Sequence, residues 1–369
     1  MKLRKFYLIS IITISILTLF INGIDRVPVE KVAVTSAVGY DIENPEGEGT
    51  LYSVPITIYN IDGQERTSRT YVAKAKTIAE TRETRQVQLD KKFILGFEKV
   101  YIISEAMASH GIKEILDILI HNPQVNDTAV MCVCRGKAED IMKLNMDGYL
   151  SSGDFLEGLI KNSNEYSFYP KNYKLIDCYL RADSEGRNLV LPYISIKDGN
   201  IVISGLAVFD KEKLAFISNH QESKVLNLLK EDNLLGILTI EDENKEPLNF
   251  YGKSKRKVNC YKENGGYKFI INLNILGDVI ANEKYKDIIQ SPKIEKETEE
   301  KLAQHVRDEC MIYISKMKNQ YKMDTLELGR VAAAKYGRDT GTDWDKVVSN
   351  SDIQVNVKIK LDRLGRGDY

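Results

Sequence analysis

The residue types that most often carry catalysis or metal binding are sparse in this chain and far apart in its sequence. Its four histidines fall in four different predicted elements, where each is more simply explained as a surface or capping residue than as a ligand. They are His110, His121, His220 and His305. The chain lacks a G-x-S-x-G nucleophile elbow, an H-E-x-x-H zinc motif, a Walker A loop and a G-x-G-x-x-G turn after a strand. We therefore expect no catalytic residue, no metal and no cofactor, and predict that the protein is not an enzyme.

The five cysteines are odd in number, and none forms a C-x-x-C pair. Cys132 and Cys134 stand two apart in TAVMCVCRG, a pattern typical of a strand, so both side chains should point to one face. A disulfide between such neighbours would be strained, and a zinc site would need more ligands than the isolated His121. The cysteines therefore indicate buried free thiols rather than a disulfide-stapled secreted domain.

Charged residues make up 28% of the chain and nearly balance at a net charge of −1, which argues against nucleic acid as the main partner. One basic group could contact anionic lipid headgroups, but a solvated loop is the simpler interpretation. It consists of Lys253, Lys255, Arg256 and Lys257. An acidic group near the start of a long predicted helix complements the helix dipole. It consists of Glu295, Glu297, Glu299 and Glu300.

The longest apolar segment lies at the N-terminus and indicates a membrane anchor. Lys2, Arg4 and Lys5 precede an uncharged run from Phe6 to Ile24, which as a helix would be about 28 Å long, close to the thickness of a bilayer's hydrocarbon core. The cations should stay cytoplasmic and the rest of the chain should lie outside. Ile21, Asn22 and Gly23 at the end of the run are a poor match to the A-x-A pattern that signal peptidase reads, which favours an uncleaved anchor over an export signal. The residues taken to mark the anchor are Phe6, Ile9, Ile12, Ile16, Leu19 and Ile24.

After the N-terminal segment, the predicted elements of the chain alternate between strands and helices. Pro55 places one predicted strand towards a sheet edge, and Asp198-Gly199 occupies the turn of a predicted hairpin. The strand order with intervening helices indicates an α/β or α+β fold. Strands are predicted over residues 31–42, 51–59, 99–104 and 128–135, the hairpin over 189–209, and helices over 73–89, 112–120 and 222–235.

The C-terminal third has the clearest pattern. Alternation over residues 267–275 and again over 353–361 predicts two strands that each bury one face. A long amphipathic helix is predicted over 294–321, with Leu302, Val306 and Tyr313 facing the core. Trp344, the only tryptophan, is expected to be half-buried in packing contacts, with a partner-binding anchor as the alternative role.

Several segments, in their order and spacing, resemble the Ger(x)C family, the C subunits of spore germinant receptors. Asp25-Arg26 and the following VTSAVGYD match the family's start, and KVYIISEAMASHGIKEILDILIHNPQV matches its middle. GLAVFDKEKLAFISNHQESKVLNLLK, the segment from Asp324 to Gly329, the Trp344 region and the last strand agree as well. The matching residues of the middle segment are Gly111, Leu116, Asp117, Asn122 and Pro123. The resemblance covers essentially the whole chain.

This resemblance implies three α/β domains with mixed, largely antiparallel sheets flanked by helices, behind the N-terminal segment. The expected divisions are 1–24, 25–196, 197–255 and 256–369. It also implies a non-enzymatic subunit in the inner membrane of the dormant spore, with its domains on the exocytoplasmic side. Its partners would be two integral membrane subunits, A and B, in a complex that senses nutrients and triggers release of ions and dipicolinate. Whether nutrient contacts this subunit is left open.

One departure from the family concerns the anchor. Family members are usually lipoproteins, acylated on the cysteine that opens a Cys-Trp-Asp-Arg motif. Counting back from Asp25-Arg26, that position holds Gly23, and the first cysteine of the chain is Cys132. N-terminal lipidation of the usual kind is therefore excluded, and we predict that Phe6 to Ile24 itself anchors the protein.

Two other functions are compatible with an N-terminal anchor. An anchored solute-binding protein should have two similar lobes around a cleft, and the sequence shows no such symmetry. An anchored envelope hydrolase should have a cleft with convergent polar groups. Both are less consistent with the sequence than a germinant-receptor subunit.

Overall fold

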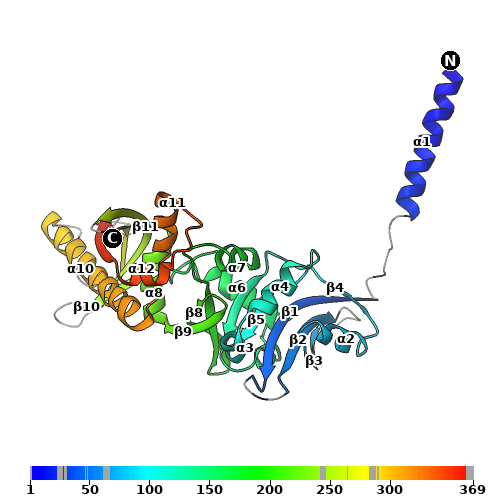
Figure 1. Cartoon of the computed structure of the whole chain (residues 1–369), viewed down its shortest axis with the longest axis horizontal. Helices are drawn as coiled ribbons and strands as arrows, with labels where there is room; N and C mark the ends of the chain where they lie inside the picture. Colours follow the sequence, from blue (N-terminus) through cyan, green and yellow to red (C-terminus); the bar gives the residue numbers. More distant parts are fainter. Residues whose placement is uncertain are drawn as a thin grey trace.

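The computed structural model describes residues 2–22, 28, 31–45, 47, 49–60, 67–241, 247–263, 265–281, 288 and 291–362. Within these residues the chain forms two β-sheets flanked by helices, and helix α1 (Lys2–Asn22) points away from both (Figure 1). The fold is therefore mixed α+β, as the order of predicted elements indicated.

Among the described residues, the first sheet has nine strands in the order β3-β2-β1-β5-β6-β7-β8-β9, with β4 paired in parallel with the start of β1. Its centre, from β1 through β5 and β6 to β7, is parallel, and antiparallel strands extend it on both sides. Parallel neighbours need long crossover connections, which helices provide here. The strands are β1 (Val32–Glu43), β2 (Leu51–Asn60), β3 (Thr67–Ala75), β4 (Lys92–Ile94), β5 (Val100–Ser104), β6 (Val130–Cys134), β7 (Val190–Lys197), β8 (Asn200–Asp210) and β9 (Lys213–Asn219).

Helices cover both faces of this sheet, so its central strands are buried on both sides. On one face, Met107 and Ile115 from the crossover helices pack against Ile103. On the other face, Leu156 packs in the cluster that contains Cys132. The helices of this unit are α2 (Glu80–Gln86), α3 (Glu105–His110), α4 (Lys113–Ile120), α5 (Ala138–Met142), α6 (Ser152–Asn162) and α7 (Leu175–Ala182).

The second sheet has the order β10-β11-β12-β13, with β12 and β13 parallel and the other pairs antiparallel. Its strands alternate between buried and exposed residues, most cleanly in β13, because helices cover one face. The elements of this unit are β10 (Leu235–Glu241), β11 (Pro247–Glu263), β12 (Gly266–Ala281), α10 (Pro292–Lys316), the π-helical turn η2 (Met317–Tyr321), α11 (Leu328–Tyr336), α12 (Trp344–Ser349) and β13 (Asp352–Leu361).

Helix α8 (His220–Lys230) connects the two sheets through one continuous core. Leu226 and Leu229 of α8 belong to a single apolar cluster that extends from α6 to β12. A main-chain bridge between Ser167 and Gly236 also joins the two units. The predicted boundaries at 196/197 and 255/256 fall in the β7–β8 hairpin and within β11. The three-domain division stays a prediction.

Most predicted strands are confirmed, as is the turn at Asp198-Gly199, where both residues have positive φ, 50° and 77°. The predicted core face of the long helix is also confirmed. Leu302, Val306 and Tyr313 of α10 are at most 3% exposed.

Four local predictions are wrong, each because tertiary pairing overrides local pattern. The helix predicted over 73–89 shortens to α2, since residues up to Ala75 pair with β2. Pro55 is not at an edge, because β2 lies between β1 and β3. The helix predicted over 222–235 ends at Lys230, and Leu235 begins β10. The basic group lies in β11 rather than in a loop, and the Arg256 guanidinium donates to main-chain carbonyls.

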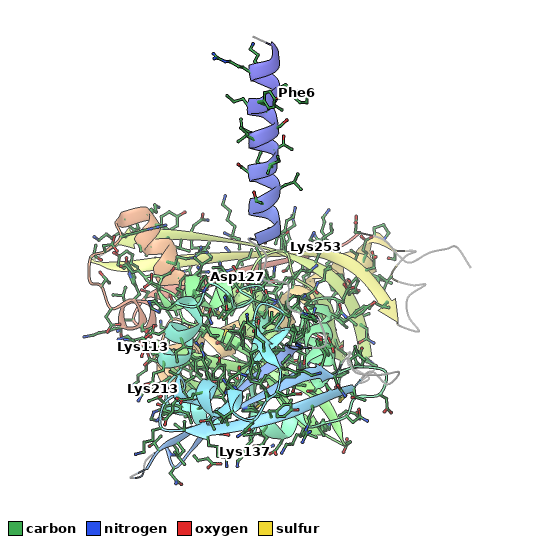
Figure 2. All side chains as sticks on the ribbon, turned by 90° about the vertical axis from the view of Figure 1, so that its right-hand side faces the viewer. Phe6, Lys113, Asp127, Lys137, Lys213 and Lys253 are labelled. Atoms are coloured by element: carbon green, nitrogen blue, oxygen red, sulfur yellow. The ribbon has the colours of Figure 1, made fainter. Side chains whose placement is uncertain are left out.

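Helix α1 exposes its apolar side chains. Phe6, Ile9, Ile12 and Ile16 are 50–69% exposed, and Figure 2 shows Phe6 on a helix that projects from the rest of the molecule. The side chain of Leu19, and all of Gly23 and Ile24, lie outside the described residues. Over the part of the chain that is described, no helix combines the length and apolar character needed to cross a membrane. The transmembrane helix is therefore not supported here and stays a prediction.

Candidate functional site at the junction of the two sheets

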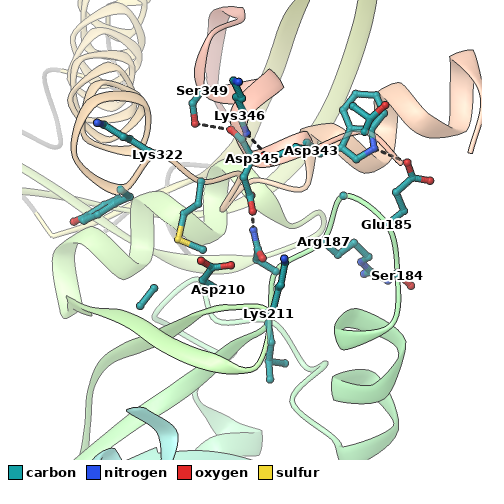
Figure 3. A pocket seen from close by; sticks show the side chains of 18 of the residues that line it. Ser184, Glu185, Arg187, Asp210, Lys211, Lys322, Asp343, Asp345, Lys346 and Ser349 are labelled. Carbon is teal, nitrogen blue, oxygen red and sulfur yellow. Dashed lines mark hydrogen bonds between the residues drawn. The ribbon is translucent and has the colours of Figure 1, made fainter. Parts of the chain in front are cut away.

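A cavity of about 1180 Å³ opens where the two sheets meet (Figure 3). Its wall is formed by the loop between α7 and β7, the β8–β9 turn, the segment after α10 and the start of α12. Small-molecule sites are usually narrower and mostly apolar, so this cavity suits water or a polar protein segment better than an apolar ligand. Its charged lining side chains include Glu185, Arg187, Asp210, Lys211, Lys322 and Asp345.

Trp344 closes one side of this cavity and is 5% exposed. Its indole Nε1 donates to Glu185 Oε1 at 2.7 Å, and Glu185 Oε2 accepts from the main chain of Asp339 at 2.8 Å. These hydrogen bonds lower the pKa of Glu185. A Cβ at Gly329 would come within 2.5 Å of the Trp344 Cβ, so only glycine allows this packing. The packing role predicted for Trp344 is confirmed, although the residue is more deeply buried than expected.

Two aspartates join the C-terminal loops to the first unit. Asp345 Oδ1 accepts from Asn188 Nδ2 at 2.8 Å and from the main-chain N of Asp324 at 2.7 Å. The carboxylate of Asp324 in turn accepts from three main-chain N–H groups in the segment 326–329, at 2.6–3.1 Å. Burial raises the pKa of Asp324 to about 7, although these N–H groups oppose the increase. The aspartates therefore fix the loop ahead of α11 against the α7–β7 loop.

A buried ion cluster around Glu327 lies beside these loops. The Glu327 carboxylate lies 3.0–3.5 Å from a side-chain nitrogen of each of four cations. Arg181 also pairs with Glu231 at 2.7 Å. The side chains of Glu327, Arg181 and Lys230 are 6%, 3% and 2% exposed. The four cations are Arg181, Arg187, Lys230 and Arg330.

The electrostatics of the Glu327 cluster depend on all four cations. Burial alone would raise the pKa of Glu327, but the cations outweigh it and lower the pKa to about 2. Arg181 and Lys230 come from α7 and α8, whereas Glu327 directly precedes α11. The cluster therefore holds the helices of the first unit and α8 to the C-terminal unit.

The cysteines do not contribute nucleophiles to this junction. All five are free and buried, and Cys132 and Cys134 lie in the same apolar cluster, which confirms their predicted common face. Burial raises the pKa of Cys178 and Cys310 to about 12 and that of Cys260 to about 11. Such thiols stay protonated at neutral pH and are poor nucleophiles.

The histidines lie in separate parts of the fold, as predicted. His110 ends α3, His121 follows α4, His220 begins α8 and His305 lies within α10. Across the described ranges, no group of three or more His, Cys, Asp or Glu side chains could hold a metal ion. What the junction does show is packing around Trp344 and ion pairing around Glu327.

The sequence pattern does not predict the Glu327 cluster, because charged residues are ordinarily assigned to the surface. A signal was nevertheless present in α7. Leu175, Cys178 and Arg181 recur every three residues, and all three are buried. An arginine on the apolar face of a helix indicates a buried ion pair.

The residues that carry the resemblance at the start of the chain also have structural roles. A Cβ at Gly39 would lie 2.6 Å from Pro55 Cγ and 2.8 Å from Met142 Sδ. The Asp41 carboxylate accepts from the main-chain N of Ala138 at 2.7 Å and of Glu139 at 3.0 Å. This Gly-x-Asp segment therefore packs β1 against α5 and caps that helix.

Comparisons with known proteins agree with this architecture. The family model for the spore germination protein N-terminal domain matches residues 25–196, and the model for the spore germination B3/GerAC-like C-terminal domain matches residues 204–365. Spore germination protein GerQC of Bacillus cereus is 23% identical over 363 residues, which cover 95% of this chain and 97% of that protein. The putative spore germination protein YfkR of Bacillus subtilis (strain 168) is 23% identical over 57% of this chain and 56% of its own length.

A solved structure has the same fold. The crystal structure of the GerBC protein superposes with a TM-score of 0.54 and 16% identity, over 88% of this chain and 97% of that chain. At this identity the likeness shows the fold alone. Together, the two family models and the relative of matching length show that the chain belongs to the Ger(x)C family of spore germinant receptor subunits.

Proposed function

We propose that this chain is the C subunit of a spore germinant receptor, a non-enzymatic protein that acts in nutrient-triggered germination. The observation that carries the proposal is the order of the two matched germination domains over 25–196 and 204–365. The relative named spore germination protein GerQC, which matches over nearly its full length, supports the same role.

In this proposal the two sheets act as one rigid body that couples the receptor subunits. The continuous apolar core through α8 and the Glu327 cluster would keep the two units in a fixed relative orientation. A and B integral membrane subunits would bind its surface, and the complex would relay the nutrient signal to ion and dipicolinate release. An anchored solute-binding protein is less consistent with the sheets that the described residues form, which have nine and four strands and are not similar lobes.

A tagged copy of the chain tests the partnership. Isolated from detergent-solubilised spore membranes, it should carry A and B subunits with it, identified by mass spectrometry. A tagged, unrelated spore membrane protein is the matched control. Recovery of the chain without either subunit, from membranes that contain both, would contradict the proposal.

We further propose that the N-terminal segment anchors the protein in the inner spore membrane, with both sheets on the exocytoplasmic side. The exposed apolar side chains of α1 and the cations Lys2, Arg4 and Lys5 support this. The uncharged run extends to Ile24. The structure describes the side-chain exposure of α1 only as far as Thr18. Gly23 stands where the family resemblance places the lipidated cysteine, so a helical anchor would replace lipidation.

Membrane fractionation tests the anchor. The intact chain should stay with spore membranes after a carbonate wash, and the double variant Ile12→Lys, Ile16→Lys should be released, because charge at the centre of a span is costly. Lys5→Arg serves as the control that should behave like the wild type. Release of the wild type by carbonate would show peripheral attachment instead.

A further inference from the structure

A second, smaller cavity lies within the unit of the first sheet, away from the junction. Its volume is about 170 Å³, and it is enclosed by β1, β2, β5, α2, α4 and the segment around β4. Most of its wall is apolar, with Val38, Val54, Ile56, Ile78, Phe93 and Leu119 among the lining side chains. The volume equals that of about six water molecules in the liquid, which suits a ligand the size of one amino acid.

A buried carboxylate with one free oxygen lines this cavity. Glu98 is 0% exposed, and its Oε2 accepts from the main-chain N of Gly96 at 2.8 Å and of Asn126 at 3.2 Å. These two bonds fix the orientation of the carboxylate. Its Oε1 has no hydrogen-bond partner within the described residues. Buried polar atoms are rarely left unpaired, so this oxygen indicates a missing donor.

The hydroxyl of Tyr101 is the second unpaired group in this wall. Tyr101 is 1% exposed, and its hydroxyl makes no hydrogen bond within the described part of the chain. It lies near enough to Glu98 to lower the pKa of that carboxyl, without reaching hydrogen-bond geometry, while burial raises the same pKa by more. Glu98 Oε1 is therefore the unpaired acceptor of this cavity, and the Tyr101 hydroxyl lies beside the same carboxyl.

A buried cation lines the same cavity. Arg85 is 5% exposed, and its Nη1 donates to the main-chain O of Val54 at 3.3 Å and to Thr81 Oγ1 at 3.0 Å. No carboxylate forms an ion pair with it in the ranges that the structure covers. Burial lowers the pKa of Arg85 to about 10, so the guanidinium stays charged at neutral pH. An uncompensated buried guanidinium is a site for an anionic group.

We infer that this cavity binds a small zwitterion with an apolar body. Its acid group would pair with Arg85, its ammonium would donate to Glu98 Oε1, and its apolar part would fill the space between α2, α4 and the sheet. Arg85 and Glu98 are the buried charged groups of this wall, and the exposed Arg82 also lines it. A buried cation and a buried carboxylate complement a ligand with one charge of each sign. The inference concerns binding by this chain itself and does not depend on the germination role.

Calorimetric titration of the full-length chain in detergent tests the site with three matched probes. L-leucine carries both charges, 4-methylpentanoate lacks the ammonium, and L-leucinamide lacks the carboxylate. We expect saturable one-to-one binding of L-leucine, with both analogues weaker by about tenfold or more, because each leaves one buried charge unpaired. Absence of saturable L-leucine binding, or equal affinity for all three probes, would overturn the inference.

Glu98→Gln is the decisive variant, because the amide can keep the bonds to Gly96 and Asn126 but presents a donor where Oε1 was free. We expect it to weaken L-leucine binding by about tenfold or more. Glu83→Gln, on the exposed side of α2, is the matched control and should not change the affinity. Unchanged binding by a folded Glu98→Gln protein would overturn the assignment. Should that variant fail to fold, Ile118→Phe decides, since its added ring would occupy the cavity and must abolish binding.

Discussion

The two sheets of this protein bury their strands in different ways. In the nine-stranded sheet every residue of β5 and β6 is buried, whereas β13 of the four-stranded sheet alternates strictly between buried and exposed residues. The difference follows from connectivity. Parallel strands need crossover helices, which cover both faces of the first sheet, while the second sheet is covered on one face.

The two patterns of burial predict how each unit depends on its neighbours. The first sheet has its own second core layer, between the sheet and helices α3, α4 and α7. The second sheet shares its one core layer with α8 and α10, so it depends on those helices and on the Glu327 cluster. We therefore expect substitutions in the shared layer to destabilise the second unit selectively.

Val306→Asp should have the largest effect. Val306 is 3% exposed in α10, and an unpaired carboxylate there should lower the free energy of unfolding of the second unit by more than about 4 kcal/mol. Limited proteolysis with mass spectrometry should show cleavage within residues 235–361 while 67–219 stays protected. Met311→Asp, at a position 43% exposed on the same helix, is the matched control. Protection of both units in Val306→Asp would show that the helix is not essential to the shared core.

Glu327→Gln should weaken the junction between the units. It leaves Arg181 and Lys230 buried with less compensating charge, at a cost of about 3 kcal/mol. Chemical denaturation should show this loss, together with earlier proteolysis of the α7–β7 loop. Glu300→Gln, at an exposed position of α10, provides the control. A stability equal to that of the wild type would mean that the cluster contributes nothing to holding the units together.

The pH dependence of the free energy of unfolding should reveal the contribution of Glu327. The pKa of Glu327 is about 2 in the folded protein against an ordinary 4.5, so its contribution is complete above pH 4.5 and is lost as the pH falls towards 2. Denaturation across this range should show a steeper loss in the wild type than in Glu327→Gln. Parallel curves for the two proteins would contradict the assignment of this pH dependence to Glu327.

Gly39→Ala tests the first sheet. Its Cβ would clash with Pro55 and Met142, so we expect a loss of about 1–3 kcal/mol in a transition that involves the whole first unit. Gly158→Ala in α6 is the control, because a Cβ there meets nothing within 4 Å and alanine favours helix. The midpoint of thermal unfolding should distinguish the two variants. An unchanged midpoint for Gly39→Ala would mean that β1 and α5 can move apart without cost.

Trp344→Phe should have the smallest effect. Phenylalanine keeps most of the ring packing against Gly329 but loses the hydrogen bond to Glu185, which should cost about 1 kcal/mol. Glu185→Gln keeps an acceptor for the indole and should behave more like the wild type in the same denaturation experiment. A larger loss in Glu185→Gln than in Trp344→Phe would show that the carboxylate acts through contacts other than the indole.

The sequence predicts the regular elements well where burial is one-sided. Ile353, Val355 and Val357 alternate with polar residues because one face of β13 meets solvent, and that pattern is readable locally. The edge strand β3 carries no such pattern, since its sequence TSRTYVAKA is polar and its conformation comes from pairing with β2. The helix predicted from Ala73 therefore begins only at Glu80.

The sequence predicts less of the candidate site than of the fold. The Glu327 cluster joins Arg181, Lys230 and Glu327, three charged residues far apart in the chain that a local pattern assigns to the surface. The same limit applies to Glu98 and Arg85, whose burial appears only once α2 and β4 close over the sheet. Motif residues such as Gly39 and Asp41 are visible in the sequence, but their packing and capping roles require the folded structure.

The most direct test of the germination role is nutrient-triggered germination of spores that carry an in-frame deletion of this chain, followed by dipicolinate release. Related receptors are deleted in the same background, and a non-nutrient trigger is the control. We predict loss of the nutrient response alone, restored by the wild-type chain. A full nutrient response in that background would contradict a role as a germinant-receptor subunit.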